Sequence, residues 1–159
     1  GDGTEPMTLA EKQAQLTLAL APLQSTGQRL AWLVEQARLR PSLPADLRLD
    51  ANRVEGCQAR LWFNADFREG RCHFQSDSDS LVVKSVAGLL CDFYSDCAPG
   101  DIVDHEPVFL GRLGLNAHLT ANRRNVLATI WRQILRFAET LSESLTHTIA
   151  TNRAPLRRP

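Results

Sequence analysis

The chain has 159 residues, of which 43% are hydrophobic and 23% are charged, and it carries no formal net charge. This size and composition predict a single soluble domain with one hydrophobic core. The balanced charge gives no indication of a nucleic-acid partner, and no apolar run approaches the roughly 18 residues that a membrane span requires. Because no signal peptide is evident either, we expect a cytoplasmic protein that binds neither nucleic acid nor membrane.

The expected domain occupies residues 7–150. Met7 is the only methionine, so residues 1–6 are predicted to be a remnant of recombinant cloning. Residues 151–159 combine prolines with arginines and are predicted to form a flexible tail.

Two helices are predicted near the start of the chain. The first covers residues 8–23, because Thr8 lies three positions before Glu11 in capping-box spacing and leucines follow at helical intervals. The second covers residues 25–40 and ends before a proline. Residues 41–56 have no sustained period, so we expect a loop there.

A β-hairpin is predicted next. Apolar and polar residues alternate along residues 58–67, as in a half-buried strand. After a short turn the alternation returns, with Cys72 and Phe74 on the apolar face. The sequence therefore predicts an antiparallel hairpin over residues 58–76.

Helices dominate the rest of the chain. Serines and aspartates at residues 76–80 are candidate N-caps for a largely buried helix. Thr120 is expected to cap a long C-terminal helix, whose apolar residues stay in register as far as Leu145. The predicted fold class is α+β, with a small antiparallel sheet of about three strands packed against several helices.

The histidines do not point to a catalytic base or a metal site. A catalytic triad needs a nucleophile, a base and an orienting group within reach, and no known spacing ties a histidine to a cysteine here. Zinc ligands usually come as close pairs, which this chain lacks. It has no glycine-rich phosphate loop, and neither of its two lysines suggests a pyridoxal-phosphate site. We expect no cofactor and no metal. The four histidines are His73, His105, His118 and His147.

The four cysteines are too few and too irregularly spaced to predict a disulfide framework, so reduced thiols are expected. Cys72 and Cys91 occupy apolar positions and are predicted to be small buried hydrophobic residues. Cys97 lies beside a turn, a position that allows an exposed thiol, and we expect it to have no particular role.

Cys57 differs from the other cysteines because it follows Gly56 in a polar segment, at the tip of a loop one residue before the predicted strand. A thiol at a loop tip is able to enter a partner's cleft, attack a sulfur atom there and withdraw carrying it. An incidental loop cysteine explains the same pattern equally well, so the residues alone leave both interpretations open.

Three segments of the chain, "NRVEGCQARLW", "FQSDSDSLVVKSVAGLL" and "LGLNAHLTANRRNVLATIWRQI", closely resemble the SufE family of sulfur-acceptor proteins. The resemblance covers about residues 16–137. It implies that Cys57, in a loop with Gly56 and Gln58, accepts sulfur from the persulfide of a pyridoxal-phosphate cysteine desulfurase of the SufS or CsdA kind. The sulfur would then pass to an iron–sulfur cluster scaffold, and the desulfurase would be stimulated.

The resemblance also implies two supporting residues. Asp79 corresponds to the family's aspartate at the start of the central helix, so the resemblance implies that Asp79 helps to control access to the cysteine loop. Arg123 corresponds to the family's arginine near the start of the last helix, so the resemblance implies that Arg123 takes part in sulfur transfer. Both have simpler alternatives, because an aspartate favours the positive end of a helix and a first-turn arginine is often only solvated.

Departures from the family pattern leave the branch open between SufE and CsdE. Ala59 stands where the family usually has serine, and residues 122–127 depart from its Ser-Arg-x-x-Gly-Leu pattern. An alternative function is a regulatory module that binds a desulfurase without carrying sulfur. A free-standing thiol hydrolase is disfavoured, because the sequence offers no convincing base.

Overall fold

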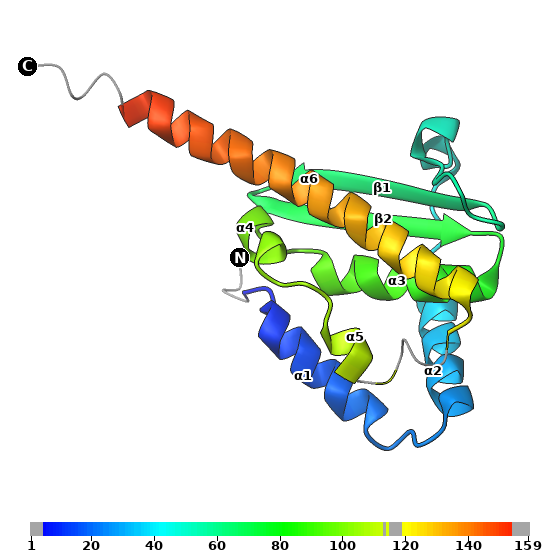
Figure 1. The fold of residues 1–159 in the computed structure, drawn as a ribbon. Coiled ribbons are helices and arrows are strands. Elements are labelled where there is room, and N and C mark those ends of the chain that lie inside the picture. Colours follow the sequence, from blue (N-terminus) through cyan, green and yellow to red (C-terminus); the bar gives the residue numbers. More distant parts are fainter. Residues whose placement is uncertain (1–4, 113, 115–118, 154–159) are drawn as a thin grey trace, which may run out of the picture.

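Helices surround a two-stranded antiparallel hairpin in the computed structural model, which describes residues 5–112, 114 and 119–153 (Figure 1). This arrangement confirms the predicted α+β class. The elements in chain order are α1 (Leu9–Leu20), α2 (Thr26–Leu39), the 3-10 turns η1 (Ala45–Leu47) and η2 (Asp50–Asn52), β1 (Leu61–Arg68), β2 (Arg71–Ser78), α3 (Leu81–Tyr94), α4 (Pro99–Val103), α5 (Phe109–Arg112) and α6 (Ala121–Arg153).

The helix starts follow the predicted capping chemistry. The Thr8 hydroxyl accepts a hydrogen bond from the backbone N–H of Glu11, whose carboxylate accepts one from the N–H of Thr8. Ser25 forms a second capping box at α2. The Thr120 hydroxyl accepts from the N–H of Arg123 at the start of α6. Each bond satisfies a backbone donor that the first turn of a helix leaves free.

The sheet has two strands, so the prediction of about three was wrong. Residues 41–56 do not contribute a full strand, because they form η1 and η2 and reach the sheet through a single bridge between Arg53 and Trp62. The hairpin also spans residues 61–78 rather than 58–76. Its two-residue turn, Glu69 and Gly70, has positive φ angles of 53° and 78°, as a tight hairpin requires.

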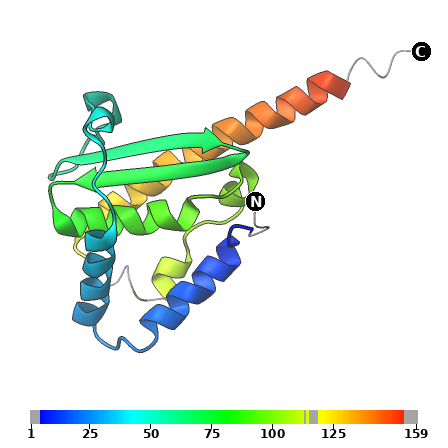
Figure 2. The same ribbon diagram turned by 180° about the vertical axis from the view of Figure 1, so that it is seen from behind.

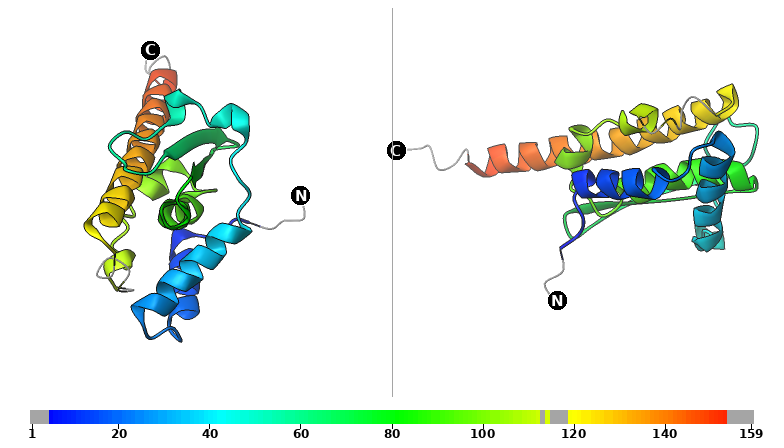
Figure 3. Two further views of the ribbon diagram at one scale, coloured as in Figure 1. Left: turned by 90° about the vertical axis from the view of Figure 1, so that its right-hand side faces the viewer. Right: turned by 90° about the horizontal axis from the view of Figure 1, so that it is seen from below.

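The core lies between one face of the hairpin, α3 and α6 (Figure 3). Phe63 and Phe74 stack with ring centroids 5.9 Å apart, and Phe137 of α6 meets Phe74 edge-on at 5.8 Å. Burying a side chain of this size stabilises the fold by roughly 1.5–3 kcal/mol. Helices α1 and α2 lie beyond α3, away from the hairpin (Figure 2). The hairpin and α3 therefore form a well-supported base for the loop that precedes β1.

The long helix α6 runs across the hairpin and projects beyond it (Figure 1). It continues through Arg153, so the first three residues of the predicted tail are helical. Residues 154–159 and His118 lie outside the described residues. In the described part of the chain, every helix is either too short or too polar to cross a bilayer.

Candidate functional site

Cys57 lies in a short loop whose two ends are tied together. The backbone N–H of Val54 donates to the carbonyl oxygen of Leu61 at 2.8 Å, and both side chains are buried. Gly56 has a φ of 83°, a conformation that strongly favours glycine. The Cys57 side chain is half-buried and packs against the edge of the core, whereas Gln58 is exposed. The thiol therefore lies at the surface on a closed, supported loop.

Asp79 holds the far end of this loop. Its Oδ1 accepts a hydrogen bond from the backbone N–H of Arg60 at 3.0 Å. The adjacent Ser78 hydroxyl donates to the Arg60 carbonyl at 2.5 Å. Ser80, not Asp79, is the N-cap of α3. The structure thus brings Asp79 to the cysteine loop, and its control of access to the thiol stays a prediction.

Asp77 is a structural residue of this region that the sequence reasoning missed. The residue is 1% exposed, and its side chain lies on the face of β2 opposite the core of aromatic rings. Oδ2 accepts from the Leu43 N–H at 2.9 Å and from Arg48 Nη2 at 2.6 Å, while Oδ1 accepts from the Ser78 N–H and lies 3.7 Å from Lys84 Nζ. One carboxylate therefore joins β2, α3 and the 41–56 segment that leads to Cys57.

The pKa of Asp77 is lowered despite its burial. Burial is the largest single influence and raises the pKa. The hydrogen bonds from Arg48, Leu43 and Ser78, with the positive charge of Lys84, outweigh it and favour the carboxylate. Asp77 is consequently ionised at neutral pH.

Burial raises the pKa of the Cys57 thiol above its ordinary value. The neutral thiol is therefore favoured, and the nucleophilic thiolate is scarce at pH 7. A thiol with this property reacts slowly unless a neighbouring group favours its thiolate.

The rate at which iodoacetamide alkylates Cys57 should rise with pH. We expect the midpoint of this rise to lie at a higher pH in the native protein than in a synthetic peptide of residues 54–60. At pH 7 the native thiol should react more slowly than the peptide, because less of it is thiolate. Mass spectrometry of the 54–60 tryptic fragment measures the native rate. A native midpoint at or below the peptide's would show that burial does not control this thiol.

Arg123 shares an end of the molecule with the Cys57 loop without contacting it. Figure 1 places the starts of α6 and α3 and the loop before β1 at one end of the hairpin. In the described part of the chain, no hydrogen bond or ion pair joins the Arg123 side chain to that loop. Arg53 and Arg60 are exposed cations within or beside the loop. The structure thus leaves Arg123 as a candidate for partner contact.

The other cysteines are buried. Cys72 is 0% and Cys91 is 2% exposed, which confirms the prediction for both. Cys97 is also buried, at 5% exposed, although it lies beside a turn. A β-bridge between Cys97 and Cys72 folds the turn after α3 back onto the start of β2, a contact between distant residues that local sequence does not reveal.

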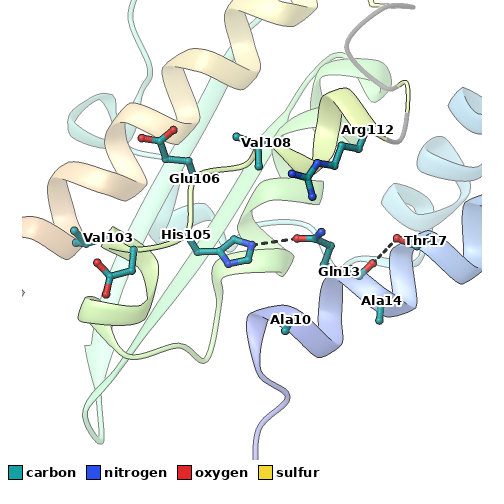
Figure 4. A pocket seen from close by; sticks show the side chains of 10 residues that line it. Ala10, Gln13, Ala14, Thr17, Val103, His105, Glu106, Val108 and Arg112 are labelled. Carbon is teal, nitrogen blue, oxygen red and sulfur yellow. Dashed lines mark hydrogen bonds between the residues drawn. The ribbon is translucent and has the colours of Figure 1, made fainter.

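A large pocket lies away from Cys57, between α1 and the segment that joins α4 to α5 (Figure 4). Its volume is about 710 Å³, and His105 crosses it to meet Gln13, with Nε2 3.2 Å from Oε1. Glu106 and Arg112 stand at its rim (Figure 4). Elsewhere too, the described side chains offer no group of three or more histidine, cysteine or acidic residues placed to hold a metal ion.

Comparison with known proteins agrees with this architecture. Residues 14–138 match the family model described as SufE, an Fe-S metabolism associated domain. An uncharacterized SufE-like protein of Synechocystis is 32% identical over 87 residues, which are 55% of each chain. A chloroplastic quinolinate synthase of Arabidopsis thaliana is 32% identical over 108 residues, 67% of this chain but 15% of that protein. The matched part of this chain thus spans about half of the Synechocystis protein and a much smaller share of the quinolinate synthase.

A solved structure supports the fold alone. The solution structure of a hypothetical protein from Thermus thermophilus superimposes with a TM-score of 0.65 at 23% identity, covering 81% of this chain and 94% of that one. The fold and the family match together define an α+β domain of iron–sulfur metabolism. The chain belongs to the SufE family.

Proposed function

We propose that this protein accepts sulfane sulfur on Cys57 from a pyridoxal-phosphate cysteine desulfurase and passes it to an iron–sulfur cluster scaffold. The observation that carries the proposal is the half-buried Cys57 thiol on a short loop tied at both ends. The family's place in iron–sulfur metabolism supports it. Cytoplasmic location, expected from the sequence, stays a prediction.

The proposed transfer is one thiol–persulfide exchange. The Cys57 thiolate attacks the outer sulfur of the desulfurase persulfide, the sulfur–sulfur bond of that persulfide breaks, and the desulfurase cysteine leaves as a thiolate. Because burial raises the pKa of Cys57, the desulfurase has to supply the cation or proton acceptor that favours its thiolate. Removal of the outer sulfur frees the desulfurase cysteine for another turnover, and this accounts for the proposed stimulation of the desulfurase.

The residues around Cys57 take distinct parts in this proposal. Gly56 supplies the left-handed backbone that turns the loop tip, and a Cβ there would meet nothing within 4 Å. Asp79 holds the loop against α3 until the partner arrives. Arg123, with Gln58 on the exposed side of the loop, contacts the desulfurase.

The test is to incubate the protein with free cysteine and a cysteine desulfurase, then map added sulfur on all four cysteines by mass spectrometry. Cys57 is alone in its tryptic peptide, residues 54–60. We expect added sulfur atoms on this peptide, and none when free cysteine is omitted. Stimulated desulfurase turnover with no sulfur on Cys57 would overturn sulfur carriage and leave a regulatory module.

Asp79→Ala is expected to raise the alkylation rate of Cys57 severalfold. The substitution removes the acceptor for the Arg60 N–H, a hydrogen bond worth about 0.5–1.5 kcal/mol, and so loosens the loop. Iodoacetamide kinetics on the 54–60 peptide measure the effect.

Two variants separate the hydrogen bond from the charge of Asp79. Asp79→Asn keeps an acceptor oxygen and should keep the slow rate. Asp46→Ala removes an exposed aspartate of η1 and should change nothing. Equal acceleration in Asp79→Asn and Asp79→Ala would assign the effect to helix electrostatics instead of the hydrogen bond.

A further inference from the structure

Cys72 and Cys97 lie opposite each other at the end of the hairpin far from the Cys57 loop. Cys72 is the second residue of β2, paired with Phe67, and Cys97 precedes α4; Figure 1 shows the start of β2 beside α4. The Cys72 N–H donates to the Cys97 carbonyl at 2.8 Å, and the Asp96 N–H donates to the Cys72 carbonyl at 2.7 Å. With Asp96 at a φ of 62°, these bonds form an isolated antiparallel bridge that holds the backbones of the two cysteines opposite each other.

The pairing places the cysteines within disulfide range. Residues opposite one another in an antiparallel pair have Cα atoms roughly 4.5–5.5 Å apart. Disulfides join Cα atoms about 4.4–6.8 Å apart. Both side chains belong to the same buried cluster. Burial, and then the negative charge that Cys97 would carry, raise the pKa of Cys72 to about 11, which agrees with two neighbouring sulfur atoms. We propose that Cys72 and Cys97 form an intramolecular disulfide when the protein meets a hydroperoxide.

Cys97 is the thiol that an oxidant reaches first. It lines a pocket of about 450 Å³ together with Arg71, Asp101 and His105, whereas Cys72 is 0% exposed. Lys12 Nζ lies 4.0 Å from Cys97 Sγ and favours the thiolate. Burial is the larger influence, and it raises the pKa of Cys97. Oxidation is therefore slow, and Cys72 acts as the resolving thiol.

The chemistry balances with hydrogen peroxide as the oxidant. The Cys97 thiolate attacks one peroxide oxygen, the O–O bond breaks, and the departing hydroxide takes up a proton to become water. The sulfur is then a sulfenic acid. The Cys72 sulfur attacks it, the S–O bond breaks, and the hydroxyl group leaves as water after taking up the Cys72 proton. Two thiols lose two electrons, and one peroxide becomes two waters.

The disulfide would join β2 to the turn before α4 and enclose all of α3 and Asp79, which precedes that helix and holds the Cys57 loop. A cross-link of this kind stabilises a protein mainly by restricting the unfolded chain. The sulfur acceptor lies at the other end of the hairpin and is not consumed. The inference does not depend on sulfur transfer.

The experiment uses reduced protein carrying Cys57→Ser, so that no disulfide forms through Cys57. After hydrogen peroxide treatment, remaining thiols are blocked with N-ethylmaleimide and the protein is digested with trypsin. We expect the loss of two hydrogen atoms and a linked pair of peptides, residues 72–84 and 85–112. The midpoint of thermal unfolding should rise by at least about 5 °C over the reduced protein.

The peptide of residues 85–112 also contains Cys91, so matched variants assign the bond. Cys91→Ala should retain the linked peptides, and Cys97→Ala should lose them. Far-UV circular dichroism checks that each variant is folded. If a variant does not fold, fragmentation of the linked peptides from the Cys57→Ser protein still assigns the bond. The proposal is overturned by a linkage through Cys91, or by the absence of any linkage after peroxide treatment long enough to oxidise Cys57 fully in the wild-type protein.

Discussion

Replacing Cys57 by serine is expected to abolish sulfur acceptance, with loading at least about 1,000-fold below wild type. A serine hydroxyl stays protonated at neutral pH and does not form a persulfide, so the loop keeps its shape and loses its chemistry. The measurement is intact-mass spectrometry after incubation with free cysteine and a cysteine desulfurase.

The control for this experiment is Cys91→Ala, which removes a buried thiol inside α3 and should load sulfur as the wild type does. Calorimetric titration separates binding from chemistry, because Cys57→Ser should still bind the desulfurase with an affinity similar to wild type. Full loading of Cys57→Ser at another cysteine would contradict the assignment of the acceptor.

Asp77→Ala is expected to lower the free energy of unfolding by about 3–5 kcal/mol, because it leaves partly buried charges without their partner. The buried N–H of Leu43 also loses its acceptor. Urea unfolding with linear extrapolation measures the loss. Asp66→Ala, which removes an exposed ion pair with Arg68, should cost at most about 1 kcal/mol.

The effect of Asp77 should depend on pH in a definite direction. Its pKa is lowered in the folded protein, so its contribution to stability is fully present above the unfolded value of about 4. That contribution is lost as the pH falls through the folded pKa. The difference in unfolding free energy between wild type and Asp77→Asn should therefore shrink below about pH 4. A constant difference from pH 7 to pH 2 would show that the charge of Asp77 does not stabilise the fold.

Local patterns predicted much of this protein. The capping box of Thr8 and Glu11 involves only residues that are close in the sequence, so the start of α1 could be predicted from the sequence directly. Strict alternation placed Phe63 and Phe74 on the core face of the hairpin, because side chains of a strand alternate in direction. Cys57 was singled out by its polar setting, and the family resemblance implies the role that we propose for it.

Long-range contacts were beyond such patterns. Asp77 looked like one of several candidate N-caps, yet it lies in β2 and binds Leu43 and Arg48, some thirty residues earlier. Cys97 lies beside a turn, a position that allows an exposed thiol, yet its bridge to Cys72 buries it. In both cases the partner is distant in sequence, so no local period signals the contact.

The sequence by itself determined the α+β class, the positions of the main helices and the hairpin, and it singled out Cys57 as the candidate acceptor, since these depend on local periodicity, capping and a contiguous motif. Tertiary structure decided how that cysteine is held. The short 41–56 segment became turns instead of a third strand, and Asp77 and Asp79 fixed the loop to α3. Burial of Cys57, which raises its pKa, likewise exists only once the core has formed beneath the loop.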